Sequence, residues 1–205
     1  MNQLILFDVD STLIDQEVIE LIAAHAGVEA KVKEITDRAM AGEIDFAQSL
    51  TARVALLKGL PISVLQDVQE EISLTKGAAE LINTLQSQGD VVAVVSGGFL
   101  EVMAPLMNSL KIEKFLANQL EISDNKLTGQ VLGKIVSRET KAEYLQKLKT
   151  ELKPTRTIAV GDGANDIEMI KSADIGIAFC AKPALIAEAD YSIEVRDLRE
   201  VLKFL

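Results

Sequence analysis

Short apolar runs alternate with helical patterns through most of the chain, and this alternation limits the possible folds more than any other feature. Parallel strands need a long crossover connection, usually a helix, so the alternation predicts an α/β fold with a doubly wound, mainly parallel sheet. Ligands of such folds bind at the carboxyl ends of the strands. The expected strands are residues 4–7, 91–95, 157–160, 175–179 and 191–194, and the expected helices are residues 77–88, 99–110, 140–152 and 166–172.

A helical block separates the first expected strand from the others. Residues 16–72 contain no strand pattern, and apolar side chains recur there at helical spacing, as at Val18, Leu21 and Ile22. We therefore expect an all-helical cap, residues 15–74, inserted into a core formed by residues 1–14 and 75–205. Residues 121–131 predict a small β-hairpin with its turn near Asp124 and Asn125.

Composition and charge exclude several classes of protein. The 205 residues are 48% hydrophobic and 25% charged, which is typical of a globular chain with an ample core. A net charge of -10 without any Lys/Arg run argues against nucleic acid and anionic membranes, and no apolar run is long enough to span a bilayer. With no signal peptide pattern and a single cysteine, Cys180, we expect a cytoplasmic protein, either a monomer or a homodimer. Cys180 has no histidine nearby and is expected to be a packed thiol.

The first expected strand ends in two carboxylates, Asp8 and Asp10. Side chains two residues apart in a strand point the same way, so both should project from the end of this strand. Like charges held so close repel each other. We therefore expect a metal ion, a shared proton or a basic side chain between or beside them.

Two other expected strands end in polar turns that should meet these carboxylates. The first is Ser96 with Gly97 and a second glycine, which could cradle a phosphate or simply cap the next helix. The second is Gly-Asp-Gly-Ala-Asn-Asp, which contributes Asp162, Asn165 and Asp166. So many carboxylates in one pocket favour Mg²⁺, a cation that takes oxygen ligands and is often shared with a substrate phosphate. The alternative for this second turn is helix capping.

Lys141 is the cation most open to a functional interpretation. The segment Thr140 to Glu143 matches a capping box, which would put Lys141 in the first turn of a helix, where the dipole disfavours positive charge. It also heads an apolar stripe that continues at Leu145 and Leu148. An inward lysine against the dipole should have an anionic partner, whereas the alternative is a surface lysine with a buried stem.

These residues resemble the haloacid dehalogenase-like phosphatase superfamily. Its four motifs are matched in order by DVDST, the Ser96 turn, Lys141 and GDGAND, with a helical insertion after the first. The segments FDVDSTLIDQE, ARVALLKGLP, VVAVVSGGF, AVGDGANDI and IAFCAKP extend the resemblance from Leu4 to the end of the chain. The resemblance implies a Mg²⁺-dependent hydrolase of a small phosphomonoester, O-phospho-L-serine, as in the last step of serine biosynthesis.

The resemblance also assigns catalytic roles. It implies that Asp8 attacks the phosphorus and forms an aspartyl phosphate. Asp10 would protonate the departing oxygen and later deprotonate the hydrolytic water. Ser96, the Gly97 N–H group and Lys141 would bind the phosphoryl oxygens, where charge stabilisation supplies most of the catalysis.

For the metal, the resemblance implies a set of oxygen ligands drawn from the first and last motifs. Asp8, the backbone carbonyl of Asp10 and Asp162 would hold Mg²⁺. Asn165 and Asp166 would support the metal and the lysine from nearby positions. A bound cation would neutralise the nucleophile so that an anionic ester can approach it.

Substrate choice is expected to lie in the cap. Arg53 occupies the apolar face of an expected helix, where a cation needs a partner, and its planar guanidinium suits a carboxylate. The resemblance pairs it with Glu17 for an α-ammonium group, although an acid in the first turn of a helix is also favoured by the dipole. Met40 and Phe46 would be apolar walls of the pocket, or simply core residues.

Two other interpretations share many of these features. A related phosphatase or phosphotransferase acting on phosphohomoserine or a sugar phosphate would have the same core residues and differ only in the cap. A phospho-accepting receiver domain also gathers acids, Mg²⁺, a hydroxyl and a lysine. A receiver accepts the phosphoryl group on a later strand, however, whereas here the paired acids follow the first strand and a helical block comes next.

Overall fold

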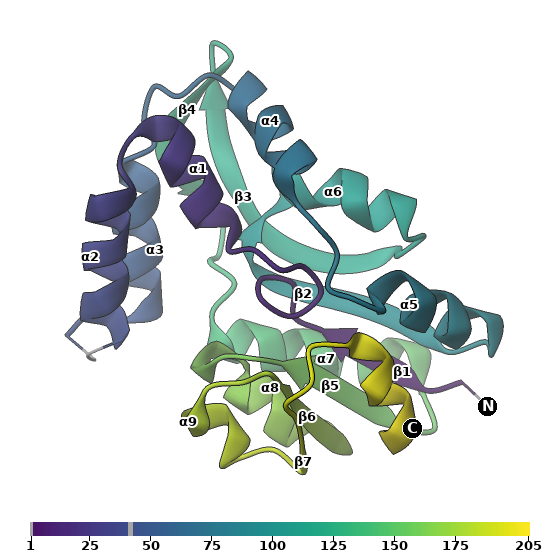
Figure 1. The fold of residues 1–205 in the computed structure, drawn as a ribbon. Coiled ribbons are helices and arrows are strands. Elements are labelled where there is room, and N and C mark those ends of the chain that lie inside the picture. Colours follow the sequence, from purple (N-terminus) through teal and green to yellow (C-terminus); the bar gives the residue numbers. More distant parts are fainter. Residues whose placement is uncertain (1, 41–42) are drawn as a thin grey trace.

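The computed structural model describes residues 2–40 and 43–205, apart from the side chain of Met40. Within these residues one seven-stranded sheet has the order β4-β3-β2-β1-β5-β6-β7, and its neighbouring strands are parallel except for β3 with β4. The predicted α/β fold with a doubly wound, mainly parallel sheet is confirmed (Figure 1). The strands are β1 (Leu4–Phe7), β2 (Val91–Phe99), β3 (Lys114–Ser123), β4 (Lys126–Leu132), β5 (Thr157–Gly161), β6 (Ile175–Phe179) and β7 (Tyr191–Ile193).

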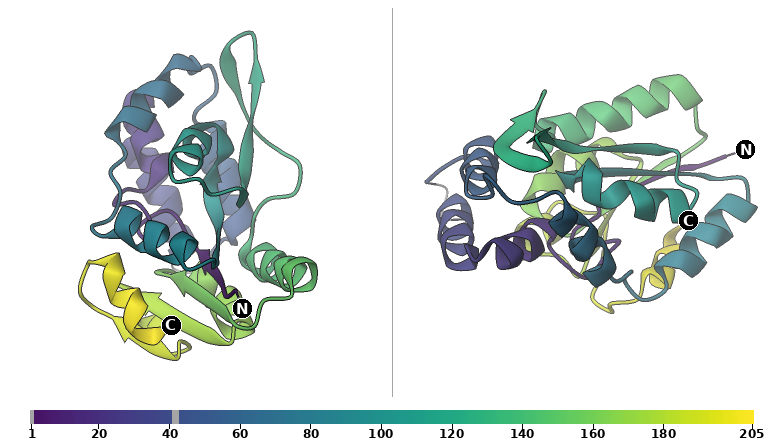
Figure 2. Two further views of the ribbon diagram at one scale, coloured as in Figure 1. Left: turned by 90° about the vertical axis from the view of Figure 1, so that its right-hand side faces the viewer. Right: turned by 90° about the horizontal axis from the view of Figure 1, so that it is seen from above.

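Side chains of the central strand enter two separate cores, because successive residues of a strand point to opposite faces. Ile5 and Phe7 pack with one set of helices, and Leu4 and Leu6 pack with the other; all four are fully buried. In the view from above, α7 lies on one side of the sheet and α5 on the other (Figure 2). The first set is α5 (Ala78–Ser87), α6 (Leu100–Ser109) and the 3₁₀ helix η2 (Leu198–Phe204), and the second is α7 (Arg138–Leu152), α8 (Ile167–Ser172) and α9 (Pro183–Ile186).

A helical segment follows β1, as the periodicity predicts. It packs against the β3–β4 hairpin, where the Gly59 N–H donates to the Leu127 carbonyl oxygen (2.8 Å) and the Leu127 N–H donates to the Leu60 carbonyl oxygen (2.9 Å). The division of the chain into a core and a cap at residues 15 and 74 stays a prediction. The segment contains α1 (Val18–Ala26), α2 (Glu29–Met40), α3 (Phe46–Ala55) and α4 (Ser63–Glu71).

The chain enters and leaves the helical segment at one place. We call residues 11–17 and 71–75 the two crossings. They run side by side, with an antiparallel bridge between Ile14 and Leu74. The Asp15 N–H donates to the Ser73 carbonyl oxygen (3.0 Å), and the Thr75 N–H donates to the Leu13 carbonyl oxygen (3.0 Å). The helical segment is therefore tied to the sheet by a short two-stranded connection.

Several local expectations need correction. α7 begins at Arg138 and its N-cap is Ser137, whose hydroxyl accepts the Thr140 N–H, so the capping box expected at Thr140 is wrong. Ser137 lies three residues before the expected cap, Thr140, and this places Lys141 about one turn deeper in the helix. β2 also runs further than expected, to Phe99, and the C-terminal helix η2 was not anticipated.

The predicted hairpin turn is present. Asp124 and Asn125 have φ values of 51° and 58°, the left-handed region that a two-residue hairpin turn of type I′ requires at both positions. The strands on either side are longer than the pattern suggested, because β3 pairs with β2 before it turns. Among the helices of the described residues, none combines the length and apolar character needed to cross a bilayer.

Candidate active site

The carboxyl ends of β1, β2 and β5 meet at one cavity. These strands are neighbours in the sheet, so the residues that follow them lie close together. The cavity has a volume of about 680 Å³ and is lined both by the ends of these strands and by helices of the helical segment. The predicted residues that line it are Asp8, Asp10, Glu17, Phe46, Arg53, Gly97, Asp162 and Asn165.

Lys141 is buried between two carboxylates. Its side chain is 1% exposed, and its ammonium donates to Asp8 Oδ1 (2.7 Å) and Asp166 Oδ1 (2.6 Å). Burial opposes the charged form, but the charges of Asp166 and Asp8 outweigh burial and raise the pKa of Lys141. Lys141 is therefore not a surface lysine, and the expected anionic partner is present twice.

Asp8, Asp162 and Asp166 form a carboxylate cluster that fits a divalent cation. One oxygen from each lies within 4.8 Å of the others. Asp166 is fully buried, and its Oδ2 accepts the N–H groups of Asp162 and Gly163 at 3.2 Å each. Because both Asp166 oxygens already have donors, Asp8 and Asp162 are the better direct ligands for a hard cation.

The electrostatics of the cluster, like its geometry, favour a bound cation. Burial, followed by the charge of Asp166, raises the pKa of Asp8 well above its usual range. The same two causes raise the pKa of Asp162 to about 7. A cation held between these carboxylates would favour their charged forms, so the cluster is compatible with a metal site.

Asp10 has different partners from Asp8, although both follow β1. Its Oδ2 accepts the Ser96 hydroxyl (3.0 Å), and its Oδ1 accepts the N–H of Val18, the first residue of α1 (2.8 Å). Burial, followed by the charge of Glu17, raises the pKa of Asp10 to about 6. One carboxylate is thus paired with a lysine, whereas the other can exchange a proton near neutral pH.

Ser96, Gly97 and Gly98 form the irregular end of β2 rather than a separate turn. The register between β2 and β3 shifts between Val95 and Phe99, and the Gly98 N–H donates to Ser96 Oγ (2.8 Å). Both glycines lie close to neighbouring side chains, and the space is smallest at Gly98. A Cβ at Gly98 would lie 2.8 Å from Asp10 Oδ2, and one at Gly97 would lie 3.0 Å from the Phe46 ring.

Asn118 is a residue of this site that sequence reasoning missed. It is 1% exposed, its Nδ2 donates to the Gly97 carbonyl oxygen (2.8 Å), and its Oδ1 accepts the Val136 N–H (2.8 Å). It therefore ties the end of β2 to the segment just before α7, which carries Lys141. The signal was an amide inside an apolar strand pattern, because a buried amide needs partners for both of its ends.

The residues from the helical segment line the opposite wall of the cavity. Arg53 is half-buried, and burial lowers its pKa. Its Nε donates to the Ser49 carbonyl oxygen (3.3 Å), and among the described residues no salt bridge to it is found. Glu17 is exposed and precedes α1, and Phe46 begins α3. Met40 ends α2, but its side chain lies outside the described part of the chain.

Two basic residues that were not predicted also line the cavity. Arg138, at the start of α7, donates to Glu168 Oε1 (2.7 Å), and Lys182 precedes α9. Cys180 lies two residues before Lys182, and burial raises the pKa of its thiol. A raised pKa disfavours the thiolate that a nucleophile needs, in agreement with the expected packed thiol.

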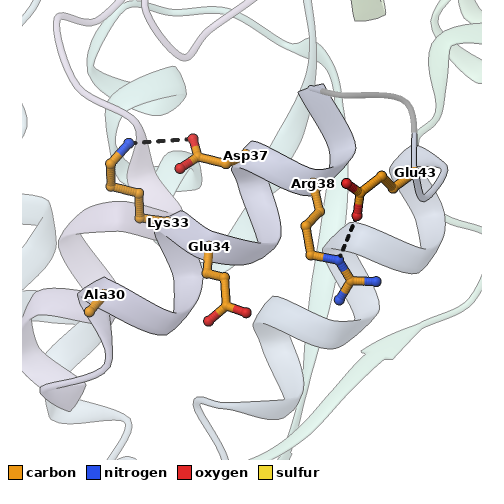
Figure 3. Close-up of a pocket in the computed structure, with 6 residues that line it drawn as sticks. All are labelled: Ala30, Lys33, Glu34, Asp37, Arg38 and Glu43. Atoms are coloured by element: carbon orange, nitrogen blue, oxygen red, sulfur yellow. Dashed lines mark hydrogen bonds and ion pairs between the residues drawn. The ribbon is translucent and has the colours of Figure 1, made fainter.

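A second hollow lies on the outer surface of α2, away from this chemistry. Figure 3 shows the charged side chains that line it, with Lys33 beside Asp37 and Arg38 beside Glu43. These ion pairs are 3.4 Å and 3.1 Å long, and all four side chains are at least half exposed. Such pairs contribute little energy and assemble no catalytic group, so the strand-end cavity is the candidate active site.

Comparison with known proteins identifies the same family that the sequence motifs resemble. Residues 5–171 match the sequence model of the haloacid dehalogenase-like hydrolases. A phosphoserine phosphatase of Lactococcus lactis subsp. lactis is 50% identical over 204 residues, covering 98% of this chain and 94% of the relative. Two solved structures each align with a TM-score of 0.94 and 48% identity over 100% of this chain and 99% of theirs. One is a phospho-aspartyl intermediate analogue of phosphoserine phosphatase, and the other is a substrate-bound phosphoserine phosphatase complex.

Proposed function

The chain belongs to the haloacid dehalogenase-like hydrolase family, and from that premise we propose that it is a phosphoserine phosphatase. It hydrolyses O-phospho-L-serine to L-serine and phosphate through an aspartyl phosphate. The observation that carries this assignment is the buried Lys141 between Asp8 and Asp166, with Asp10 bonded to Ser96 beside it. A receiver domain is not supported, because the matching family and relatives are hydrolases.

In the first step, an oxygen of Asp8 attacks the phosphorus of the ester. The bond between Asp8 and phosphorus forms as the bond from phosphorus to the serine oxygen breaks. Asp10, with a pKa of about 6, is suited to give its proton to that leaving oxygen. The products of this step are L-serine and an acyl phosphate on Asp8.

In the second step, water replaces the aspartyl oxygen on phosphorus. Asp10, now ionised, removes a proton from the attacking water, and the Asp8 carboxylate leaves. Asp10 ends the cycle protonated, and phosphate is released. The hydrogen bonds from Ser96 and from the Val18 N–H keep Asp10 in place for both proton transfers.

The transferring phosphoryl group needs positive charge and donors around its oxygens. The Lys141 ammonium, the Ser96 hydroxyl and the Gly97 N–H are proposed to bind these oxygens. Mg²⁺ would be held by Asp8, the Asp10 backbone carbonyl and Asp162, with Asp166 and Asn165 in support. When bound, it supplies charge neutralisation at the nucleophile and at the phosphoryl oxygens.

Residues 15–74 are proposed to act as the cap that selects the substrate. The Arg53 guanidinium suits the α-carboxylate, and Glu17 suits the α-ammonium group. Phe46, packed on Gly97, forms an apolar wall next to the phosphoryl site, and Met40 is proposed for the same wall. The single cysteine supports a cytoplasmic location, and the monomer or homodimer expectation belongs to this proposal as well.

Phosphate release from a panel of phosphomonoesters with Mg²⁺ tests the assignment. The panel should contain phospho-L-serine, phospho-L-homoserine, a sugar phosphate and an aryl phosphate. We expect phospho-L-serine to give the highest kcat/KM. If phosphohomoserine or a sugar phosphate is preferred, the chain is a phosphatase of the same family with another substrate.

A further inference from the structure

Arg196 follows β7 near the end of the chain, yet its guanidinium contacts the first crossing, residues 11–17. Nε donates to Asp15 Oδ1 (2.8 Å), Nη1 to the Ser11 carbonyl oxygen (3.2 Å) and Nη2 to the Ile14 carbonyl oxygen (3.5 Å). All three guanidinium nitrogens are directed at one loop. A planar, five-donor group can hold several acceptors in a fixed relation, which an ammonium cannot do.

Ser11, one of these acceptors, has an unusual backbone. Its φ of 57° lies in the left-handed region, which a residue with a side chain adopts only where its surroundings hold it there. Besides the contact with Arg196, its N–H donates to the Gln16 carbonyl oxygen (3.2 Å). In this conformation its hydroxyl donates to Glu17 Oε1 (2.6 Å). The orientation of the Glu17 carboxylate thus depends on the conformation of Ser11.

Asp15, the charged partner of Arg196, also connects the two crossings. The Thr75 hydroxyl donates to Asp15 Oδ1 (3.4 Å), and the Ser73 hydroxyl donates to Asp15 Oδ2 (3.5 Å). The side chains of Arg196 and Asp15 are 40% and 42% exposed, so their ion pair adds little to global stability. Its effect is local and falls on the loop that carries Ser11 and Glu17.

We propose that Arg196 is a positioning residue for substrate selectivity: through Ser11 it holds the Glu17 carboxylate in place at the cavity. This inference rests on the proposed function, in which Glu17 binds the α-ammonium group of the substrate. Loss of Arg196 leaves Asp8, Lys141 and the carboxylate cluster in place. It weakens binding of substrates that carry an ammonium group and spares those that do not.

The test compares two substrates in the Arg196→Gln variant. We expect kcat/KM for phospho-L-serine to fall about tenfold, mainly through a higher KM, as for the loss of one charge-assisted hydrogen bond. Hydrolysis of an aryl phosphate, which has no ammonium group, should stay within about twofold of wild type. Hydrogen exchange should become faster in residues 11–17.

Arg199→Gln is the matched control, because Arg199 lies three residues further along with a similar exposure of 43%. It bonds to Asp197 and to Glu80 of α5 and makes no contact with the crossings among the described residues. In this variant, the ratio of kcat/KM for phospho-L-serine to kcat/KM for the aryl phosphate should be the same as in wild type. Ser11→Ala should reproduce the effect of Arg196→Gln, and the double variant should lose no more than about twofold beyond either single one.

The outcomes separate the two proposals. If the wild-type protein does not prefer phospho-L-serine, the proposed function fails before Arg196 is considered. If it does, and Arg196→Gln lowers the rates for both substrates equally or leaves both unchanged, Arg196 is not a positioning residue for selectivity. Fully additive losses in the double variant would show that Arg196 does not act through Ser11.

Discussion

The two walls of the active-site cavity are built in different ways. On the sheet side, Lys141, Asp8 and Asp166 are at most 3% exposed and bonded to one another. On the helical side, Glu17 is exposed and Arg53 is half-buried, with one backbone acceptor for its side chain. The groups proposed for chemistry are therefore fixed before the substrate arrives, whereas the groups proposed for recognition receive their partners from it.

This difference predicts how substitutions in each wall should affect activity and stability. A buried, fully bonded set responds to the loss of one member as a unit, because the remaining charges lose their partners. An exposed recognition group can be changed at the cost of one contact. Sheet-side variants should therefore affect every substrate and the fold itself, and helical-side variants should affect selected substrates.

The largest effect is expected at the nucleophile. Asp8→Asn should lower turnover by roughly 10⁴-fold or more for every phosphomonoester, because Asp8 is the carboxylate proposed to form the acyl phosphate. Asp10→Asn should still accept a phosphoryl group from an aryl phosphate and release it slowly, since water then lacks its base. Mass spectrometry of the quenched Asp10→Asn protein should find the adduct on Asp8; an adduct elsewhere would contradict the assignment.

Next in size is the buried lysine. Lys141→Met keeps the volume of the side chain but leaves Asp8 and Asp166 without their cation, so it should lower the free energy of unfolding by about 3–5 kcal/mol. Urea denaturation measures this loss. Lys147→Met, at an exposed position of the same helix, is the control and should cost less than about 1 kcal/mol. Equal losses in both variants would show that the buried lysine and its two carboxylates do not respond as a unit.

On the helical side, Arg53→Ala should reduce kcat/KM for phospho-L-serine by about ten- to a hundredfold, the value of one or two charge-assisted hydrogen bonds. The kcat/KM of Arg53→Lys should lie between those of Arg53→Ala and wild type, because lysine keeps the charge but cannot donate two parallel hydrogen bonds to a carboxylate. An aryl phosphate has no carboxylate, so its hydrolysis should change far less. Equal losses on both substrates would mean that Arg53 acts on the fold rather than on recognition.

The smallest expected effect is the change in folding stability with pH and with Mg²⁺. The pKa values of Asp10 and Asp162 rise in the folded protein to about 6 and about 7, from 3.8. Between pH 3.8 and about 7, the folded state therefore binds more protons than the unfolded state. Stability from these groups is present below pH 3.8 and is lost as pH rises to about 7.

Thermal unfolding of the metal-free protein measures this dependence. The contribution of these carboxylates to the melting temperature should decrease from pH 4 to about pH 7, and Mg²⁺ should restore several degrees at pH 7. In the Asp162→Ala variant, Mg²⁺ should raise the melting temperature by less than in the unmodified protein. A melting temperature that is insensitive to Mg²⁺ in the unmodified protein would contradict the metal site.

The sequence was most informative where a pattern has a single structural solution. The apolar runs that end at Phe7 and Phe179 are strand-length and alternate with helical patterns, and Asp124-Asn125 is typical of a tight turn; the structure confirms both predictions. The cap of α7 was predicted one turn too late, because the segment Thr140 to Glu143 matches a capping box, whereas the hydroxyl that caps the helix belongs to Ser137, three residues earlier. The structure uses Ser137 because its hydroxyl reaches the Thr140 N–H group.

Contacts between distant parts of the chain were harder to predict. Asn118 joins Gly97 to Val136, and Arg196 reaches Ser11 across 185 residues. Neither residue belongs to a local motif, and each gains its partners only after the sheet has formed. Asp8 and Asp162 could be predicted because each follows the end of an expected strand, whereas Lys141 was predicted from its place at the head of an apolar helical stripe.

The paired crossings have a consequence for how such a chain can change over time. Since Ile14 and Leu74 are bridged, the two ends of the helical segment lie next to each other on the core. The entropic cost of closing a loop between two such points grows only slowly with the length of the inserted segment. The segment can therefore be lengthened, shortened or exchanged between lineages while strand order and the carboxylate cluster stay the same. Chimeras that join at these two positions are the natural starting point for redesigning the substrate range.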